Sequence, residues 1–245
     1  MPLNLEQQKE LLHLYDESLL RIKTLKDSEL GKPCLICGLG PSLLKIDKDR
    51  YKNCIKIVCN NFQWVPNFFI NDYAPNYWCG ANSYEVLAKN VVACAQKNIS
   101  VLVTIPLMEE MYNLLLGIKD SEYYKNIHPW YWAGGVLQAL VSEKFNSPET
   151  YSLGQSVLVH MIALSLWLGC NPIYVAGIDF SYHTEGPTHA GFSEQDALSN
   201  RSLLDSAKYP VFKDLEILAK YAKSVGTKIF NLSSDQNGWP VEFTA

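Results

Sequence analysis

Residues 154–180 read GQSVLVHMIALSLWLGCNPIYVAGIDF, and this stretch predicts the fold class. Apolar side chains recur at helical spacing over Val157–Leu168, and Gly169 and Pro172 follow where such a helix should end. The continuous apolar run Ile173–Ala176 is typical of a parallel strand that is covered on both faces. The stretch therefore predicts a helix that leads into a buried parallel strand.

The rest of the chain repeats this alternation. Strand patterns occupy Lys32–Cys37, Lys56–Cys59, Phe68–Asn71, Ser100–Thr104 and Lys228–Leu232. Helical patterns occupy residues 4–28, Tyr84–Lys97, a segment that Pro106 opens, and Val211–Val225. Strands that alternate with helices imply a mostly parallel sheet with helices on both faces. We therefore expect an α/β, Rossmann-like fold, with an N-terminal helix in residues 1–30 and a single domain in residues 31–245.

Two segments depart from this alternation. The apolar stripe of the N-terminal helix predicts that it packs on the sheet or on a partner subunit. Residues 118–150 contain the aromatic run HPWYW at 128–132, and we expect an irregular lid or binding loop there, in which His128 can touch a substrate.

The composition is that of a soluble globular protein, with 48% apolar and 19% charged residues. A net charge of −4 and dispersed basic residues argue against a nucleic-acid surface. We see no secretory signal in the polar start of the chain and no apolar run long enough to span a membrane. Seven cysteines, an odd number, predict reduced thiols and a cytoplasmic location, and the pair Cys34 and Cys37 fits strand packing better than zinc.

Polar or glycine residues follow four of the predicted strands, and the carboxyl ends of parallel strands share one edge of a sheet, where ligands bind. These residues are Gly38, Gly40, Pro41 and Ser42, then Asn60 and Asn61, then Asn71 and Asp72, and finally Gly177 and Asp179. A glycine-rich turn lets backbone N–H groups approach a phosphate or carboxylate, and Asn side chains can read a base or a ribose. The alternative is structural: ordinary tight turns, helix caps and a loop cap. The convergence predicts a nucleotide-binding crevice.

The loop after Asp179 contains the residues that could perform chemistry. A histidine can accept a proton from a hydroxyl, so His189 and His183 are candidate bases. Tyr182 can donate a hydrogen bond to a leaving phosphate. The alternative for each is a solvated loop residue, whereas His160, inside an apolar helix, is expected to pack. We predict no metal site, because neither zinc nor metalloprotease spacing is present.

Five short motifs carry a resemblance to known families. GLGPSLLKID at 38–47, CNNF at 59–62 and LGCNPIYVAGIDF at 168–180 resemble bacterial CMP-sialic-acid-dependent sialyltransferases. They also resemble the domain family shared by motility accessory factors and 6-hydroxymethylpterin pyrophosphokinases. THAG at 188–191 and FNLSSDQNG at 230–238 are more similar to this second group.

The likeness to sialyltransferases implies a transferase that moves an acidic sugar from a CMP donor to an acceptor hydroxyl, without an essential metal. It implies that Gly38, Gly40 and Ser42 hold the phosphate region, and that Asn60 or Asn61 and Asn71 contact the CMP moiety or the donor sugar. It also places Gly154, Gln155 and Ser156 near the donor and Tyr182 at its phosphate. Those enzymes have a late catalytic histidine, whereas this chain has Lys208-Tyr209-Pro210 at that place. The base would then be His189 or His183.

The second group implies other reactions. A pyrophosphokinase would use ATP, Mg²⁺ and a pterin, with Asp72 and Asp179 as candidate metal ligands. A motility accessory factor would transfer a nonulosonic acid to a protein hydroxyl. A non-catalytic nucleotide-binding module would keep Gly38–Ser42 but tolerate loss of both loop histidines. We expect the glycosyltransferase first. Its partners would be a nucleotide or nucleotide-sugar, a glycan or protein hydroxyl, and, as a further candidate, a second copy of the chain.

Overall fold

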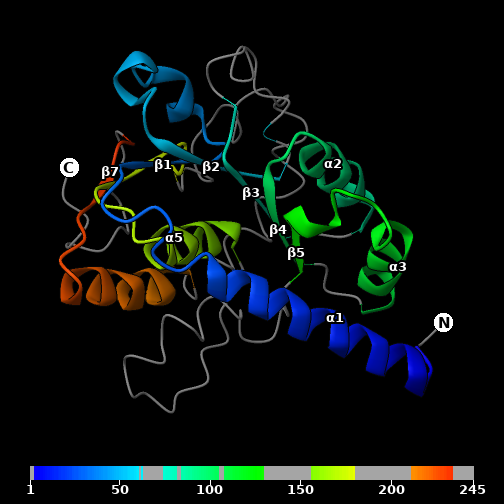
Figure 1. Cartoon of the computed structure of the whole chain (residues 1–245). Helices are drawn as coiled ribbons and strands as arrows, with labels where there is room; N and C mark the ends of the chain where they lie inside the picture. The colour runs from blue at the N-terminus through cyan, green and yellow to red at the C-terminus, as the bar shows by residue number, and fades with distance from the viewer. Residues whose placement is uncertain are drawn as a thin grey trace.

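The protein is described here by a computed structural model (Figure 1). The described residues are 3–60, 62, 74–81, 84–104, 108–129, 156–179 and 211–233. The predicted strand Phe68–Asn71 and the part of the predicted irregular segment after residue 129 lie outside them.

Seven parallel strands of the described residues form one sheet, in the order β5-β4-β3-β2-β1-β6-β7. Their bounds are β1 Cys34–Cys37, β2 Ile55–Cys59, β3 Tyr77–Ala81, β4 Ser100–Thr104, β5 Ile127–Pro129, β6 Ile173–Ala176 and β7 Ile229–Asn231. The predicted α/β class with a parallel sheet is confirmed. The continuous apolar runs form the central strands because both of their faces are covered.

Helices cover the two faces of this sheet (Figure 1). The α-helices are α1 Leu5–Thr24, α2 Tyr84–Gln96, α3 Met108–Ile118, α5 Val157–Trp167 and a further helix over residues 211–224. Short 3₁₀ helices in the described residues are η1 Pro41–Lys45, η2 Asp49–Tyr51 and η4 Tyr124–Asn126. One apolar core lies on the side of α5 and the 211–224 helix, and the other lies on the side of α2 and α3. Successive strand residues point into opposite cores, since Ile36 belongs to the first and Leu35 to the second.

Two parts of the sequence interpretation differ from the structure. Strand β3 was not predicted, because YWCGA contains a glycine and no alternation, and its pairing with β2 and β4 is what makes it a strand. The segment that was expected to be irregular contains β5. This strand has only three residues, and its pairing with β4 is what makes it a strand.

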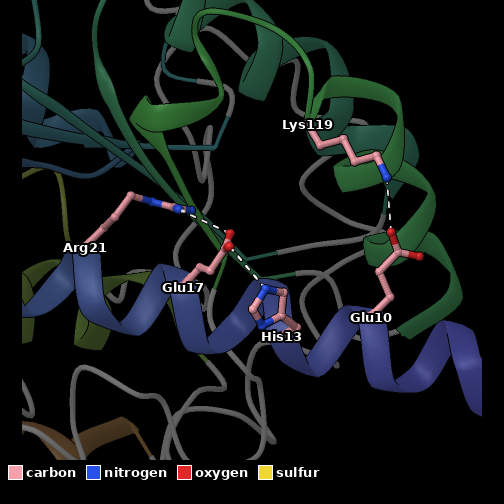
Figure 2. Close-up of polar contacts among 5 residues, drawn as sticks. All are labelled: Glu10, His13, Glu17, Arg21 and Lys119. Carbon is pink, nitrogen blue, oxygen red and sulfur yellow. Dashed lines mark hydrogen bonds and ion pairs between the residues drawn. The ribbon is translucent and has the colours of Figure 1, made fainter.

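Helix α1 covers the edge strand β5. The Ser18 hydroxyl donates to the carbonyl of Pro129 over 2.7 Å, and the Arg21 guanidinium donates to the carbonyl of Ile127 over 3.1 Å. At the other end of α1, Glu10 pairs with Lys119 of α3 over 3.1 Å (Figure 2). The bonds from Ser18 and Arg21 satisfy carbonyl groups that an open sheet edge would leave unpaired. The prediction that the N-terminal helix packs on the sheet is confirmed.

Candidate functional site

The chain adds β1 to β5 in order toward one edge of the sheet and then adds β6 and β7 on the other side of β1. The topological switch point therefore lies between β1 and β6. From β1 the sheet continues through β2 on one side and through β6 on the other, and all of these strands are parallel. Ligands of open α/β sheets bind at the carboxyl ends of strands at such a switch point. The turns that begin at Gly38 and at Gly177 therefore lie at the position where this architecture places a ligand.

These two turns pack directly against each other. The N–H of Gly38 donates to the carbonyl of Ala176 over 2.8 Å, and the N–H of Gly40 donates to the carbonyl of Gly177 over 2.6 Å. A Cβ atom on Gly40 would lie 2.6 Å from Oδ2 of Asp179 and 2.7 Å from the Gly177 carbonyl oxygen. Gly177 itself has φ +70°, which glycine adopts at little cost. The close contact between the two turns thus explains why Gly40 and Gly177 are both glycine.

A third contact joins the turns through a side chain. Oδ2 of Asp179 accepts a hydrogen bond of 2.9 Å from the N–H of Ser42 in the first turn of η1. The N-cap residue of η1 is Gly40, which has no side chain, so Asp179 serves as the cap that the sequence offered as one alternative. The N–H groups of Gly38, Gly40 and Ser42 consequently have acceptors within the protein. This arrangement differs from the predicted phosphate cradle, in which those groups would be free.

Ser42, Asp179 and Ser233, which we call the switch-point cluster, come from three distant segments of the chain. The Ser233 hydroxyl donates to the carbonyl of Ile178 over 3.2 Å and lies 3.1 Å from the Ser42 hydroxyl. Both serines are buried. Oδ1 of Asp179 is also buried, and among the described residues it has no hydrogen-bond partner. A buried carboxylate oxygen without a donor is uncommon in proteins, so Oδ1 marks this cluster as the candidate site.

Asn60 lies at the carboxyl end of β2, next to the switch point. Its backbone has φ +43°, its N–H donates to the carbonyl of Cys79 over 3.0 Å, and its carbonyl accepts from the Trp78 indole over 3.0 Å. The structure therefore shows a turn-forming role for the backbone of Asn60. A ligand role for its side chain stays a prediction.

Ser156 lies at the start of α5, and its hydroxyl accepts a hydrogen bond of 3.3 Å from the N–H of Leu158. This is an N-cap, the structural role that serine favours at this position. Because α5 precedes β6, its N-terminus faces the same sheet edge as the switch-point cluster. The prediction that Ser156 approaches a donor substrate is not tested by this contact.

The remaining predicted site residues lie outside the described residues, so their roles stay predictions. They are Asn61, Asn71, Asp72, Gly154, Gln155, Tyr182, His183 and His189.

Two described histidines are buried and separate from the cluster. His160 is fully buried in α5, and burial lowers its pKa to about 4, in agreement with the predicted packing role. His128 belongs to β5 and is 4% exposed, so it is part of the sheet and not of an irregular binding loop. Burial, assisted by the nearby Arg21 guanidinium, lowers the pKa of His128 to about 4.

Sequence reasoning did not identify Asp214 as a buried acid. It lies in the helix over residues 211–224, on the face that also buries Val211, Leu215 and Leu218, and burial raises the pKa of its carboxyl to about 7. An acidic residue at the spacing of an apolar stripe was the signal that could have found it. Ser233 was also missed as a site residue, although it lies in the quoted run FNLSSDQNG.

The described residues show neither a metal-binding group nor a membrane-spanning helix. Within the described parts of the chain, no three His, Cys, Asp or Glu side chains are grouped so that they could hold a metal ion. None of the helices in those parts has the length and apolar character needed to cross a membrane.

Comparison with known proteins identifies the fold. No family model and no curated protein matches the sequence. The sialyltransferase CstII from Campylobacter jejuni, solved with cytidine 5′-monophosphate, superposes with a TM-score of 0.52 at 20% identity, over 88% of this chain and 85% of that one. The α-2,3-sialyltransferase Cst-I of the same organism superposes with a TM-score of 0.51 at 17% identity, over 88% of this chain and 82% of that one. This chain has the fold of these sialyltransferases.

The sialyltransferase fold confirms the predicted Rossmann-like class and the resemblance to the bacterial sialyltransferases. A further structure of CstII, with a trisaccharide acceptor and CMP, superposes with a TM-score of 0.52 at 20% identity, over 87% of this chain and 85% of that one. The structures named here are sialyltransferases, and they give no support to the pyrophosphokinase or motility-factor alternatives.

Proposed function

We propose that this protein is a glycosyltransferase that moves an acidic sugar, a sialic or other nonulosonic acid, from a CMP-activated donor to the hydroxyl of a glycan or protein. We assign the activity to a single domain in residues 31–245. The observation that carries the proposal is the convergence of Ser42, Asp179 and Ser233 at the switch point of a sialyltransferase fold. CstII, which has this fold, has been captured with CMP and with a trisaccharide acceptor.

The charge at the cluster indicates which part of the donor lies there. Oδ2 of Asp179 is engaged by Ser42, whereas Oδ1 is available to a hydrogen-bond donor. A carboxylate attracts hydroxyl or amino groups and repels phosphate, because like charges in a partly desolvated site raise the free energy. We therefore place the nucleoside, with its ribose hydroxyls and amino group, beside Asp179. The phosphate and sugar then extend toward the loop that follows residue 179.

That loop would supply the chemistry. His189, or else His183, takes the proton from the acceptor hydroxyl as its oxygen attacks the anomeric carbon. The bond between that carbon and the CMP phosphate breaks, and CMP departs with the electron pair. Tyr182 donates a hydrogen bond to the departing phosphate. These steps need no metal ion.

The test is a binding measurement by thermal shift and calorimetry with CMP, 2′-deoxy-CMP, UMP and ATP, each in EDTA and in Mg²⁺. We expect CMP to bind in EDTA and to stabilise the fold by about 2.7 kcal/mol at 100 times its Kd. We expect 2′-deoxy-CMP or UMP to bind more weakly, according to whether Asp179 accepts from the ribose or from the base. Binding of ATP only with Mg²⁺, without any response to CMP, would show a pyrophosphokinase instead. Binding of CMP without transfer from CMP-sialic acid to any glycan or protein acceptor would show an accessory module.

A further inference from the structure

The outward face of α1 carries three exposed leucines. Leu5 is 66% exposed, Leu12 is 55% exposed and Leu20 is 64% exposed, although the opposite face of the helix buries Leu11, Ser18 and other residues against the sheet. Single exposed leucines are common on protein surfaces, but three along one face of one helix form an apolar stripe.

Two charged residues complete this stripe. With about 100° of rotation per residue, Leu5, Lys9, Leu12, Asp16 and Leu20 fall within about 80° of one another around the helix axis. Lys9 and Asp16 are exposed, and within the described residues neither forms an ion pair. We call these five residues the outer stripe.

The outer stripe is complementary to itself in the antiparallel direction. Two copies of α1 can lie antiparallel about a two-fold axis that passes between residues 12 and 13. The residue numbers of any two residues at the same level then add up to 25. Leu5 is then level with Leu20 of the partner subunit, and Lys9 with Asp16 of the partner subunit. Around the helix axis, Lys9 and Asp16 lie only about 10° on either side of the direction that faces the partner, so the two charges lie close together across the two-fold axis, whereas Leu5 and Leu20 lie about 30° to opposite sides of it.

We propose that the outer stripe of α1 binds the same stripe of a second copy of this chain, with the two helices antiparallel. Apolar contact between Leu5 and Leu20 of the partner subunit would flank two symmetric ion pairs between Lys9 and Asp16 of the partner subunit. A parallel pair would instead bring Lys9 against Lys9 of the partner subunit, with like charges opposed. The charge order therefore favours a second copy in the antiparallel direction. The dimer does not depend on the proposed enzymatic activity.

Neighbouring contacts hold the stripe in place. Glu10 forms an ion pair with Lys119 of α3 (Figure 2), and Arg21 donates to a carbonyl of the edge strand β5. These contacts fix the orientation of α1 on the sheet. His13 pairs with Glu17 over 3.3 Å, and it would lie level with Leu12 of the partner subunit. A contact between two single helices is smaller than a standard protein interface, so we expect a weak dimer with a Kd on the order of micromolar or higher.

The first experiment is sedimentation velocity of the full chain from about 1 to 200 μM, a range chosen for a weak complex. We expect the wild type to dimerise as concentration rises and Leu12→Glu to remain monomeric. The matched control is Leu116→Glu, an exposed leucine of α3 at 41% exposure, which should dimerise like the wild type. Lys9→Asp and Asp16→Lys should each be monomeric, and the double variant Lys9→Asp/Asp16→Lys should dimerise again. Circular dichroism verifies that each variant is folded. A wild type that stays monomeric at every concentration, or a dimer that all of these variants leave intact, overturns the proposal.

The second experiment tests the direction of pairing. All seven native cysteines are buried, so one cysteine introduced on the outer stripe is the accessible thiol. Under mild oxidation, a mixture of Leu5→Cys and Leu20→Cys chains should form a covalent heterodimer, and neither variant should cross-link alone. Cross-linking of Leu5→Cys with itself, without the heterodimer, would show a parallel pair and overturn the antiparallel arrangement.

Discussion

Oδ2 of Asp179 accepts a hydrogen bond of 2.9 Å from the backbone N–H of Ser42, a residue 137 positions earlier in the chain. This contact joins the turns after β1 and β6, the two strands on either side of the topological switch point. It leaves the second carboxylate oxygen, Oδ1, buried and without a partner among the described residues. One side chain thus holds the two turns together at the edge of the sheet where ligands of such folds bind.

The two roles of Asp179 can be separated by substitution. Asp179→Asn keeps an oxygen that can cap η1 but removes the charge, so we expect near wild-type stability and at least tenfold weaker CMP binding, about 1.4 kcal/mol, as for loss of a charged hydrogen bond. Asp179→Ala removes the cap as well, and we expect it to lower the free energy of unfolding by about 0.5–2 kcal/mol. Urea denaturation and calorimetry measure both quantities.

The matched control is Asp120→Asn, an exposed aspartate after α3, which should change neither quantity. If Asp179→Asn bound CMP as tightly as the wild type, Asp179 would be a structural cap alone.

Gly40→Ala tests whether packing between the turns requires this glycine. The new Cβ would meet Oδ2 of Asp179 at 2.6 Å, so the turns must move apart, and we expect a loss of about 1–3 kcal/mol in the free energy of unfolding. Gly117→Ala in α3 is the control, because nothing lies within 4 Å of its Cβ position. Alanine there should stabilise the helix by about 0.5–1 kcal/mol. Equal stability of the two variants in urea would show that the turns adapt freely.

Stability should depend on pH through three buried groups. His128 and His160 have pKa values lowered from 6.5 to about 4, so between these values the unfolded chain binds protons that the folded protein does not. Each histidine therefore makes stability fall as pH decreases from 6.5 to 4, by up to about 1.4 kcal/mol per pH unit. Asp214 acts in the opposite direction, because its pKa is raised from 3.8 to about 7 and its contribution is lost as pH rises through that window.

Urea titrations at several pH values between 4.5 and 6.5 separate these contributions. Asp214→Asn should make the rise of stability with pH steeper, and His128→Gln should make it shallower. An unchanged slope in Asp214→Asn would mean that this carboxyl titrates normally in the folded protein.

The thiols should be unreactive in the folded protein. All seven cysteines are free and buried, and burial raises the pKa of Cys59 to about 12 and of Cys94 to about 11. Because the thiolate is the reactive form, a disulfide reagent such as DTNB should modify almost none of them in buffer and seven in guanidinium chloride. Rapid modification of Cys37 in buffer would contradict its place in the core strand β1.

Much of the fold could be predicted from local pattern. Strand β6 was predicted with its observed bounds, and α5 to within one residue, because a fully buried strand and a fully buried helix are apolar along their whole length. The alternation of such segments was enough to predict a parallel sheet. Strand β3 could not be predicted, since its glycine-containing sequence is extended only between β2 and β4.

The candidate site, like the fold, was predicted only in part. By itself the sequence determined that glycine, serine, asparagine and aspartate follow the strands, because turn residues have strong local preferences. Only the tertiary structure decided their partners. It brought the Gly40 turn against the Gly177 turn, paired Ser42 with Asp179 and Ser233, and buried Asp214 in a helix face. The physical reason is that these contacts join segments far apart in the chain, and their geometry exists only once the parallel sheet has aligned the carboxyl ends of β1, β6 and β7.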